Sequence, residues 1–348
     1  MSAELATLAD DEAVMFEGPV AHRYTDLQPG TEQGAGPHTV RTLPRPPGER
    51  LSTVATVNDV HFGETVCGHM AGLDIGPVLS VGPDEEPYPL VMNRAAVAEI
   101  VALAPDAVVA KGDLTASGLV EEYEQFLAVY AGAFGDRLVV TRGNHDNPAV
   151  SAGLPPSPAW QSVELAGVVL AVLDTSRPGW VGGEVDADQA EWLDELAARA
   201  DRPVMVFGHH PLAVQDERLE LLFGADALVG SGLTAASVQR LAGVVTRRPA
   251  IVGYFAGHTH RNKLRHLPAT GLFPWIEVAC AKDFPGSWAE YRVFEGGILQ
   301  VHRRIHAEPA AIEWSERCRS LFGGMYPNYA LGAIEDRCFE VPLREPGG

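Results

Sequence analysis

Five short apolar runs, each followed by a small polar motif, constrain this 348-residue chain more than any other feature. The runs are rich in β-branched and other strand-forming residues, which is typical of buried strands. The motifs that follow them are Asn58-Asp59-Val60-His61, Gly112-Asp113, Gly143-Asn144-His145-Asp146, Gly208-His209-His210 and Gly257-His258-Thr259-His260. A chain with this pattern places its chemistry where strands end.

Helical segments separate these runs. Apolar residues recur at helical spacing over 93–103, 121–133, 188–200 and 234–245, and Asp188 is expected to cap the third of these helices. After residue 256 the helices stop, and 275–279, 291–294 and 298–305 are typical of strands. Alternating strands and helices followed by consecutive strands indicate an α/β fold of two sheets with helices outside.

The spacing of the motifs predicts that their side chains meet. Successive motifs lie 31 to 65 residues apart, which suits strand-to-strand units, so we expect them to gather at the carboxyl ends of one sheet. Two side chains separated by one residue in an extended segment share a face, as in Asp59 with His61 and His258 with His260. Aspartate, asparagine and histidine without thiolate suit a divalent metal such as Mn, Fe or Zn.

The ordered set of five motifs resembles the calcineurin-like metallophosphoesterases over residues 51–306. Gly143-Asn144-His145-Asp146 and His209-His210-Pro211 are most similar to the bacterial class III cyclic-nucleotide phosphodiesterase branch. The resemblance implies a four-layer αββα sandwich with a di-metal site. It further implies two sets of metal ligands that share a bridging Asp113, namely Asp59, His61, Asp113 and His260 for the first ion, and Asp113, Asn144, His209 and His258 for the second.

The resemblance also implies catalytic and substrate-binding roles. His145 matches a histidine that acts as general acid or transition-state stabiliser, and Asp146 matches the carboxylate that orients it. His210, next to a ligand, is expected behind the metal or facing the substrate. Arg261 and Asn262 are candidate phosphate contacts, and an ordinary surface arginine is the alternative reading of Arg261.

The implied reaction is in-line attack by a metal-bridging hydroxide on a small phosphodiester, with a 3′,5′-cyclic nucleotide as the candidate substrate. A phosphomonoesterase, a nuclease and a non-catalytic binding protein that keeps the fold are the alternatives. No motif names the substrate, and we expect specificity to come from the loops 61–89 and 216–232. We expect Cys67 and His69 in a loop over the pocket and Lys282-Asp283 in a solvated turn.

The charge of the chain narrows the choice of substrate. With 26 Lys and Arg against 46 Asp and Glu, the formal net charge is −20. Such a surface repels nucleic acids and anionic membranes. Two divalent ions would concentrate positive charge in one pocket, so a small anion could still be drawn in. We therefore expect a small phosphoester partner and no nucleic acid polymer.

The remaining expectations concern organisation and location. Residues 1–50 are rich in Gly, Pro and Thr and predict an N-terminal extension that is partly ordered. Residues 51–306 form the catalytic domain, and 307–348 form a tail that packs on the body. The first 18 residues lack the pattern of a secretory signal, and the four cysteines are scattered. We expect a cytoplasmic protein without a membrane segment; the pattern leaves the oligomeric state open.

Overall fold

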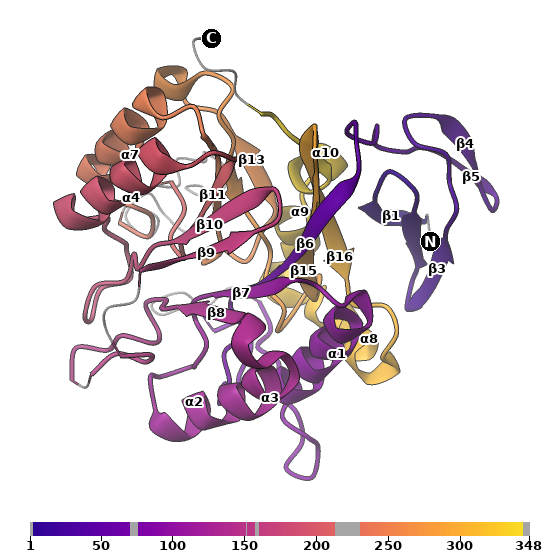
Figure 1. The fold of residues 1–348 in the computed structure, drawn as a ribbon. Coiled ribbons are helices and arrows are strands. Elements are labelled where there is room, and N and C mark those ends of the chain that lie inside the picture. The colour runs from indigo at the N-terminus through magenta and orange to yellow at the C-terminus, as the bar shows by residue number, and fades with distance from the viewer. Residues whose placement is uncertain (1–2, 70–75, 151, 157–159, 213–229, 344–348) are drawn as a thin grey trace.

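The computed structural model describes residues 3–69, 76–150, 152–156, 160–212 and 230–343 (Figure 1). Two six-stranded sheets pack face to face in its centre. The first contains, in spatial order, β17 (Phe339–Val341), β16 (Gly297–Arg304), β15 (Ser287–Phe294), β6 (Arg50–Val57), β7 (Ala107–Lys111) and β8 (Leu138–Thr141). The second contains β13 (Lys263–Arg265), β14 (Trp275–Glu277), β12 (Ile251–Ala256), β11 (Val204–Phe207), β10 (Val168–Val172) and β9 (Gln161–Leu165).

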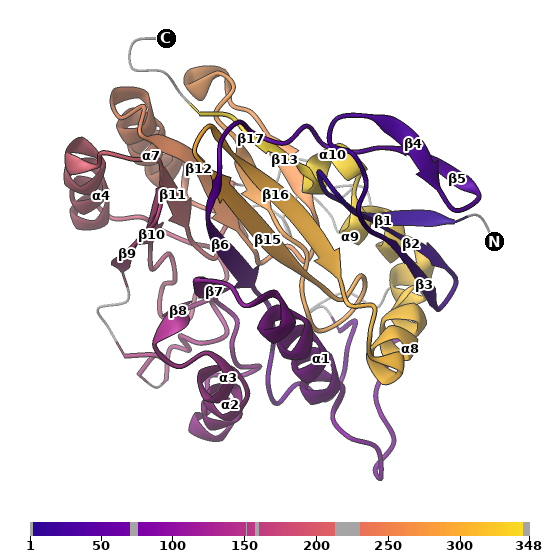
Figure 2. The same ribbon diagram turned by 45° about the vertical axis from the view of Figure 1, so that its right-hand side comes forward.

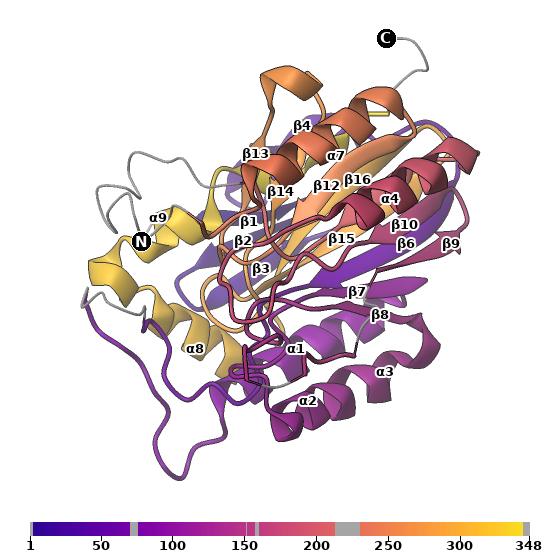
Figure 3. The same ribbon diagram turned by 90° about the vertical axis from the view of Figure 1, so that its left-hand side faces the viewer.

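Helices cover the outer face of each sheet, which makes four layers (Figure 3). The first sheet packs against α1 (Tyr88–Leu103), α2 (Val120–Phe126), a π-helical turn (Leu127–Ala131), α3 (Gly132–Phe134) and α8 (Pro309–Cys318). The second packs against α4 (Ala187–Arg199) and α7 (Ala235–Arg247). The αββα architecture expected from the sequence is therefore confirmed.

Aromatic side chains fix the two sheets against each other. Phe207 of β11 stacks on Phe255 of β12 with ring centroids 5.2 Å apart, and both rings meet the edge of Tyr291 from β15. All three are fully buried, and burying one such side chain stabilises a fold by about 1.5–3 kcal/mol. This packing fixes the position of one sheet relative to the other.

The expected helix over 188–200 begins differently from the prediction. Its N-cap is Asp186, whose Oδ1 accepts a hydrogen bond from the backbone N–H of Gln189 at 2.8 Å. Asp188 lies inside the first turn, where its negative charge favours the positive end of the helix dipole. The predicted cap was therefore two residues too late.

Residues 3–50 contain more regular structure than the partly ordered extension expected for residues 1–50. Strands β1 (Glu4–Leu8), β2 (Ala13–Glu17) and β3 (Val20–Tyr24) form a small sheet, and β4 (Glu32–Ala35) pairs with β5 (His38–Arg41). They lie beside β16 and the C-terminal helices (Figure 2). Arg304 of β16 covers the ring of Phe16 at 3.9 Å, and Arg292 of β15 pairs with Asp10. These partners are distant in sequence, so local composition does not reveal the strands.

The C-terminal residues also pack on the body. Trp314 of α8 stacks on Tyr88 of α1 at 4.2 Å, and β17 pairs with β16. Between them lie a 3₁₀ turn (Leu321–Gly324), α9 (Tyr326–Leu331) and α10 (Ile334–Arg337). Two further 3₁₀ turns occur at Gly135–Arg137 and Pro268–Thr270. Among the described residues, no helix has the length and apolar character needed to cross a membrane.

Candidate metal centre

The five motifs meet at the carboxyl ends of strands from both sheets. β6, β7 and β8 run parallel in the first sheet, while β11 and β12 run parallel in the second. The expectation of a single sheet was wrong. The two sheets face each other, so the ends of their parallel strands lie along one common edge, where the five loops converge.

Hydrogen bonds between the sheets hold these loops together. The Lys111 ammonium, at the end of β7, donates to the carbonyl of Ala256 in β12 at 2.8 Å. The carbonyl of Lys111 lies 2.8 Å from Nδ1 of His209, and the backbone N–H of His258 donates to the Asp59 carboxylate at 2.9 Å. Burial lowers the pKa of Lys111 to about 7, with nearby Asp59 opposing this shift.

Asp113 lies between two groups of candidate ligands. Its Oδ2 is 3.2 Å from Nε2 of His209 and 3.6 Å from Nε2 of His61. Its Oδ1 accepts the backbone N–H of His145 at 2.9 Å. A β-carbon at Gly143 would overlap the Asp113 carboxylate, which explains a glycine at that position. The carboxylate is thus held where it faces both groups.

The first group contains Asp59, His61 and His260, whose ligand atoms lie within 4.8 Å of one another. His260 Nε2 is 3.4 Å from Asp59 Oδ1. Although His61 is buried, its Nε2 makes no hydrogen bond with any described residue. Burial raises the pKa of Asp59, but His260 outweighs it and holds the pKa at about 2. A buried ring nitrogen without a hydrogen bond beside a carboxylate is the environment that a cation would complete.

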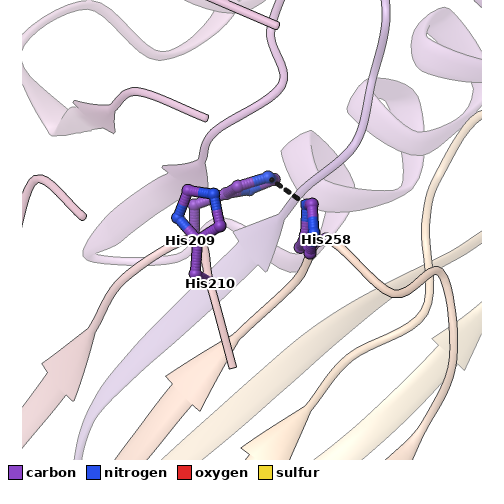
Figure 4. Close-up of side chains that lie close together, drawn as sticks. All are labelled: His209, His210 and His258. Atoms are coloured by element: carbon purple, nitrogen blue, oxygen red, sulfur yellow. Dashed lines mark hydrogen bonds between the residues drawn. The ribbon is translucent and has the colours of Figure 1, made fainter. Parts of the chain in front are cut away.

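The second group contains Asn144, His209 and His258. His209 Nε2 lies 3.2 Å from Asn144 Oδ1 and 3.2 Å from His258 Nδ1, the contact drawn in Figure 4. Burial lowers the pKa of His258 to about 4. Burial also opposes protonation of His209, but the carboxylate of Asp113 outweighs it and raises that pKa to about 9. The negative charge of Asp113 therefore favours a positive charge on its neighbour His209.

The backbone at these residues is unusual. Among the described residues, eight that are not glycine have positive φ, and five of them are candidate ligands, namely Asp59, His61, Asp113, His258 and His260. Such conformations concentrate at functional sites because the surrounding structure must enforce them. The seven side chains expected to hold metal thus come together, with nitrogen and oxygen donors that suit two divalent ions.

His145 and Asp146 lie beside this site in different environments. His145 is exposed, and its Nδ1 is 2.6 Å from the carbonyl of Ala116. Asp146 is buried and accepts the backbone N–H groups of Gly143, Leu114 and Thr115 at 2.8 to 3.0 Å. The backbone carbonyl of Ala116, and not the expected Asp146 carboxylate, is therefore the partner that orients the His145 ring. Asp146 holds two ligand loops together.

The three candidate substrate contacts are buried among protein groups. His210 places Nδ1 2.8 Å from Thr175 Oγ1 and Nε2 3.1 Å from the carbonyl of Val181, so neither nitrogen is available to a substrate. Arg261 donates from Nε to Glu277 at 2.7 Å and is 3% exposed. These environments correct the expectation of substrate contact and indicate structural roles.

Asn262 differs from its expected role for a similar reason. It is 1% exposed, and its side-chain NH₂ group donates to the carbonyls of Ala330 and Leu331 at 3.2 Å. Its Oδ1 accepts the backbone N–H of Ala279 at 3.2 Å. Asn262 therefore joins the His258–His260 turn to the C-terminal segment.

Sequence reasoning missed the residues behind the first group. Lys282 and Asp283 are buried rather than solvated: the Lys282 ammonium donates to Glu64, whose Oε2 lies 3.2 Å from His61 Nδ1. Asp283 Oδ2 lies 3.5 Å from His260 Nδ1. Cys67 is buried in the core beneath them, whereas His69 is exposed. The sequence Lys282-Asp283 after a strand does not indicate whether the two side chains are buried. Only the fold shows that they lie behind the candidate ligands.

The comparisons with known proteins agree with this geometry. The family model described as calcineurin-like phosphoesterase matches residues 52–262. The chain therefore belongs to the calcineurin-like phosphoesterases, a class of phosphoric ester hydrolases. This result confirms the resemblance seen in the five motifs.

The relatives in this family include phosphodiesterases. A glycerophosphodiester phosphodiesterase of Enterobacter lignolyticus is 29% identical over 45% of this chain and 56% of its own length. A cAMP/cGMP dual specificity phosphodiesterase of Mycobacterium tuberculosis is 35% identical over 31% of this chain and 37% of its own. The matches thus span from about a third to little more than half of these relatives.

Solved structures support the fold. A dimetal phosphatase from Danio rerio superimposes with a TM-score of 0.53, covering 74% of this chain and 97% of that protein at 13% identity. At this identity the similarity shows a shared fold and says nothing about the substrate.

Proposed function

We propose that the protein is a metal-dependent phosphodiesterase that hydrolyses a small phosphodiester. The position of Asp113 is the observation that carries the proposal. One carboxylate oxygen lies within 3.6 Å of histidines from two ligand groups, which is the arrangement that a bridging ligand of two ions requires. The proposed ligands are Asp59, His61, Asp113, Asn144, His209, His258 and His260.

The bound ions would lower the pKa of a water molecule and neutralise phosphoryl oxygens. The protein supplies the geometry. Lys111 O accepts the Nδ1–H of His209 and so presents Nε2 to the site. Asp146 fixes the loops that carry Asp113 and Asn144 by accepting their neighbours' backbone N–H groups. Manganese, iron and zinc are the proposed metals because the donors are nitrogen and oxygen.

His145 is the proposed catalytic residue. Its ring is exposed at the edge of the site and lies 4.7 Å from the ring of His61. Because Nδ1 donates to the Ala116 carbonyl, Nε2 is the atom left to face a substrate. In the imidazolium form, Nε2–H would donate a proton to the departing oxygen.

The substrate is proposed to be small, with 3′,5′-cyclic nucleotides as the leading candidates. The net charge of −20 disfavours long nucleic acids, and the relatives named above act on diesters. Trp180 is 59% exposed, and the Arg177 guanidinium lies 4.4 Å from its ring. Gly179 N–H donates to Asn147 O, which ties this segment to the Asn144 loop. We assign Trp180 to contact with the organic part of the substrate.

Two further expectations concern the cellular location of the protein and the loop expected to set its specificity. Four free, buried cysteines suit a reducing compartment, so a cytoplasmic location remains our proposal. Part of the loop 216–232 lies outside the described residues, so its expected role in specificity stays a prediction.

A metal-dependent hydrolysis assay tests the function. Protein stripped with a chelator is reloaded with Mn²⁺ and offered bis(p-nitrophenyl) phosphate, p-nitrophenyl phosphate and cyclic AMP. We expect turnover of the diesters that returns with two ions per chain. Faster turnover of the monoester would favour a phosphomonoesterase. Two bound ions without turnover of any substrate would indicate a binding protein.

A further inference from the structure

Helix α9 lies directly behind the metal-ligand turn His258–His260. The hydroxyl of Tyr329 donates to the carbonyl of Thr259, the residue between the two histidines, at 2.7 Å. Asn262 N–H donates to the carbonyl of Ala330 at 2.9 Å. The turn needs such support because both histidines have positive φ, at 71° and 54°.

A second hydroxyl of α9 reaches the ring of His260 through a carboxylate. Tyr326 OH donates to Asp283 Oδ1 at 2.7 Å, and Cys280 Sγ donates to the same oxygen at 2.8 Å. The other oxygen, Oδ2, faces His260 Nδ1 at 3.5 Å. All three side chains around His260 are buried, so they hold one arrangement.

This chain of contacts fixes which nitrogen His260 presents. A carboxylate at Nδ1 favours the tautomer with the proton on that nitrogen. The lone pair of Nε2, which lies 3.4 Å from Asp59 Oδ1, is then available to bind a metal ion. Carboxylates that hold a metal-binding histidine in this way commonly change metal affinity 10- to 100-fold when altered. Tyr326 acts one step further out, because it holds the carboxylate.

We propose that α9 is a positioning element of the metal centre, in which Tyr329 fixes the backbone of the His258–His260 turn and Tyr326, through Asp283, fixes the His260 ring. Both hydroxyls donate to protein groups, so the role proposed for the two tyrosines is positioning and not substrate contact. The inference rests on the di-metal site proposed above and gives the C-terminal residues a role that their sequence does not indicate.

Metal binding by the full-length protein tests this role. Tyr326→Phe and Tyr329→Phe are compared with wild type by titrating metal-free protein with Co²⁺, following heat and the visible spectrum. Tyr326→Phe should bind the ion held by His260 about 10-fold more weakly and alter the spectrum of that ion alone, whereas Tyr329→Phe should weaken both ions because its turn carries a ligand of each. Tyr291→Phe keeps the ring between the sheets and removes only a buried hydroxyl, so it is the control for the substitution itself and is expected to bind both ions like wild type.

A double-mutant cycle separates positioning from general stability. Because Tyr326 acts through Asp283, Tyr326→Phe should change affinity little once Asp283→Asn is present, whereas Tyr329→Phe should still weaken it. Wild-type affinities in both tyrosine variants, or equal losses in Tyr291→Phe, would overturn the inference. If wild-type protein takes up no divalent ion, the proposed function itself fails.

Discussion

The Oδ2 atom of Asp113 lies 3.2 Å from Nε2 of His209, and the two residues follow strands of different sheets. The centre of the proposed metal site is therefore a contact between sheets. The aromatic contacts of Phe207, Phe255 and Tyr291 lie between the same two sheets and help to hold them together.

Asp113→Asn should prevent the side chain at this position from binding two metal ions at once. The amide keeps the shape of the side chain and tolerates positive φ, but one of its two oxygens is lost. We expect fewer than two ions per chain and hydrolysis at least about 100-fold slower, since even the partners of ligands account for up to 100-fold. Metal content and rate are measured against Asp136→Asn, an exposed site with the same charge change. Normal metal content in Asp113→Asn would contradict the bridging role.

The adjacent histidines should behave differently. His209→Asn should lose metal, because Nε2 of His209 faces Asp113. His210→Asn should retain two ions while lowering the free energy of unfolding by about 1–3 kcal/mol, because Thr175 Oγ1 and Val181 O lose their partner. Urea denaturation and metal analysis of both variants test these two expectations. Loss of metal from His210→Asn would show that His210 is a ligand.

Arg261→Gln should affect folding rather than substrate binding. It removes one partner of the buried Glu277, which keeps its ion pair with Arg265, so the free energy of unfolding should fall by about 1–3 kcal/mol. Urea unfolding and KM are measured together, and an increased KM at unchanged stability would restore the phosphate-contact interpretation.

Trp180→Ala should weaken binding of a cyclic nucleotide. Stacking of a base on an aromatic ring contributes about 1–3 kcal/mol, so KM for cyclic AMP should rise about 10-fold with kcat and metal content unchanged. Leu272→Ala, which removes an apolar side chain that is even more exposed than Trp180, is the control. Equal KM values in both variants would remove Trp180 from the substrate site.

Stability should fall as the pH drops below 6.5 because of His302. Burial, with Arg337 and Arg304 nearby, holds the pKa of this histidine well below its ordinary value of 6.5. The unfolded chain then takes up a proton that the folded chain refuses, so the free energy of unfolding decreases by up to about 1.4 kcal/mol per pH unit. His302→Gln should reduce this slope, whereas the exposed His22→Gln should not. Equal slopes in all three proteins would contradict the assignment.

The sequence predicts which candidate ligands come together better than it predicts the residues around them. Asp59, His258 and the other candidate ligands sit in short motifs directly after strands, so local pattern is sufficient to find them. Arg261 and His210 adjoin ligands in sequence, but their partners Glu277, Thr175 and Val181 lie elsewhere in the chain. Burial of a polar side chain depends on such distant partners, which no local pattern reveals.

The same contrast between local pattern and distant contacts holds for the fold. The strands and helices from residue 51 onward follow clear periodicity. The N-terminal strands are four or five residues long and are separated by turns, so their pattern is too short to recognise. Their stability comes from contacts such as Arg292 with Asp10, which form only when the chain has closed on itself.

The left-handed backbone of five proposed ligands limits which amino acids these positions accept. Asp, Asn and His tolerate this conformation better than β-branched residues, and only glycine adopts it freely. A donor that is chemically suitable but β-branched, such as threonine, would strain the turn before any metal arrived. Selection at these five positions therefore acts on backbone shape and donor chemistry together, and a designer who moves this site to another protein must transplant the turns along with the side chains.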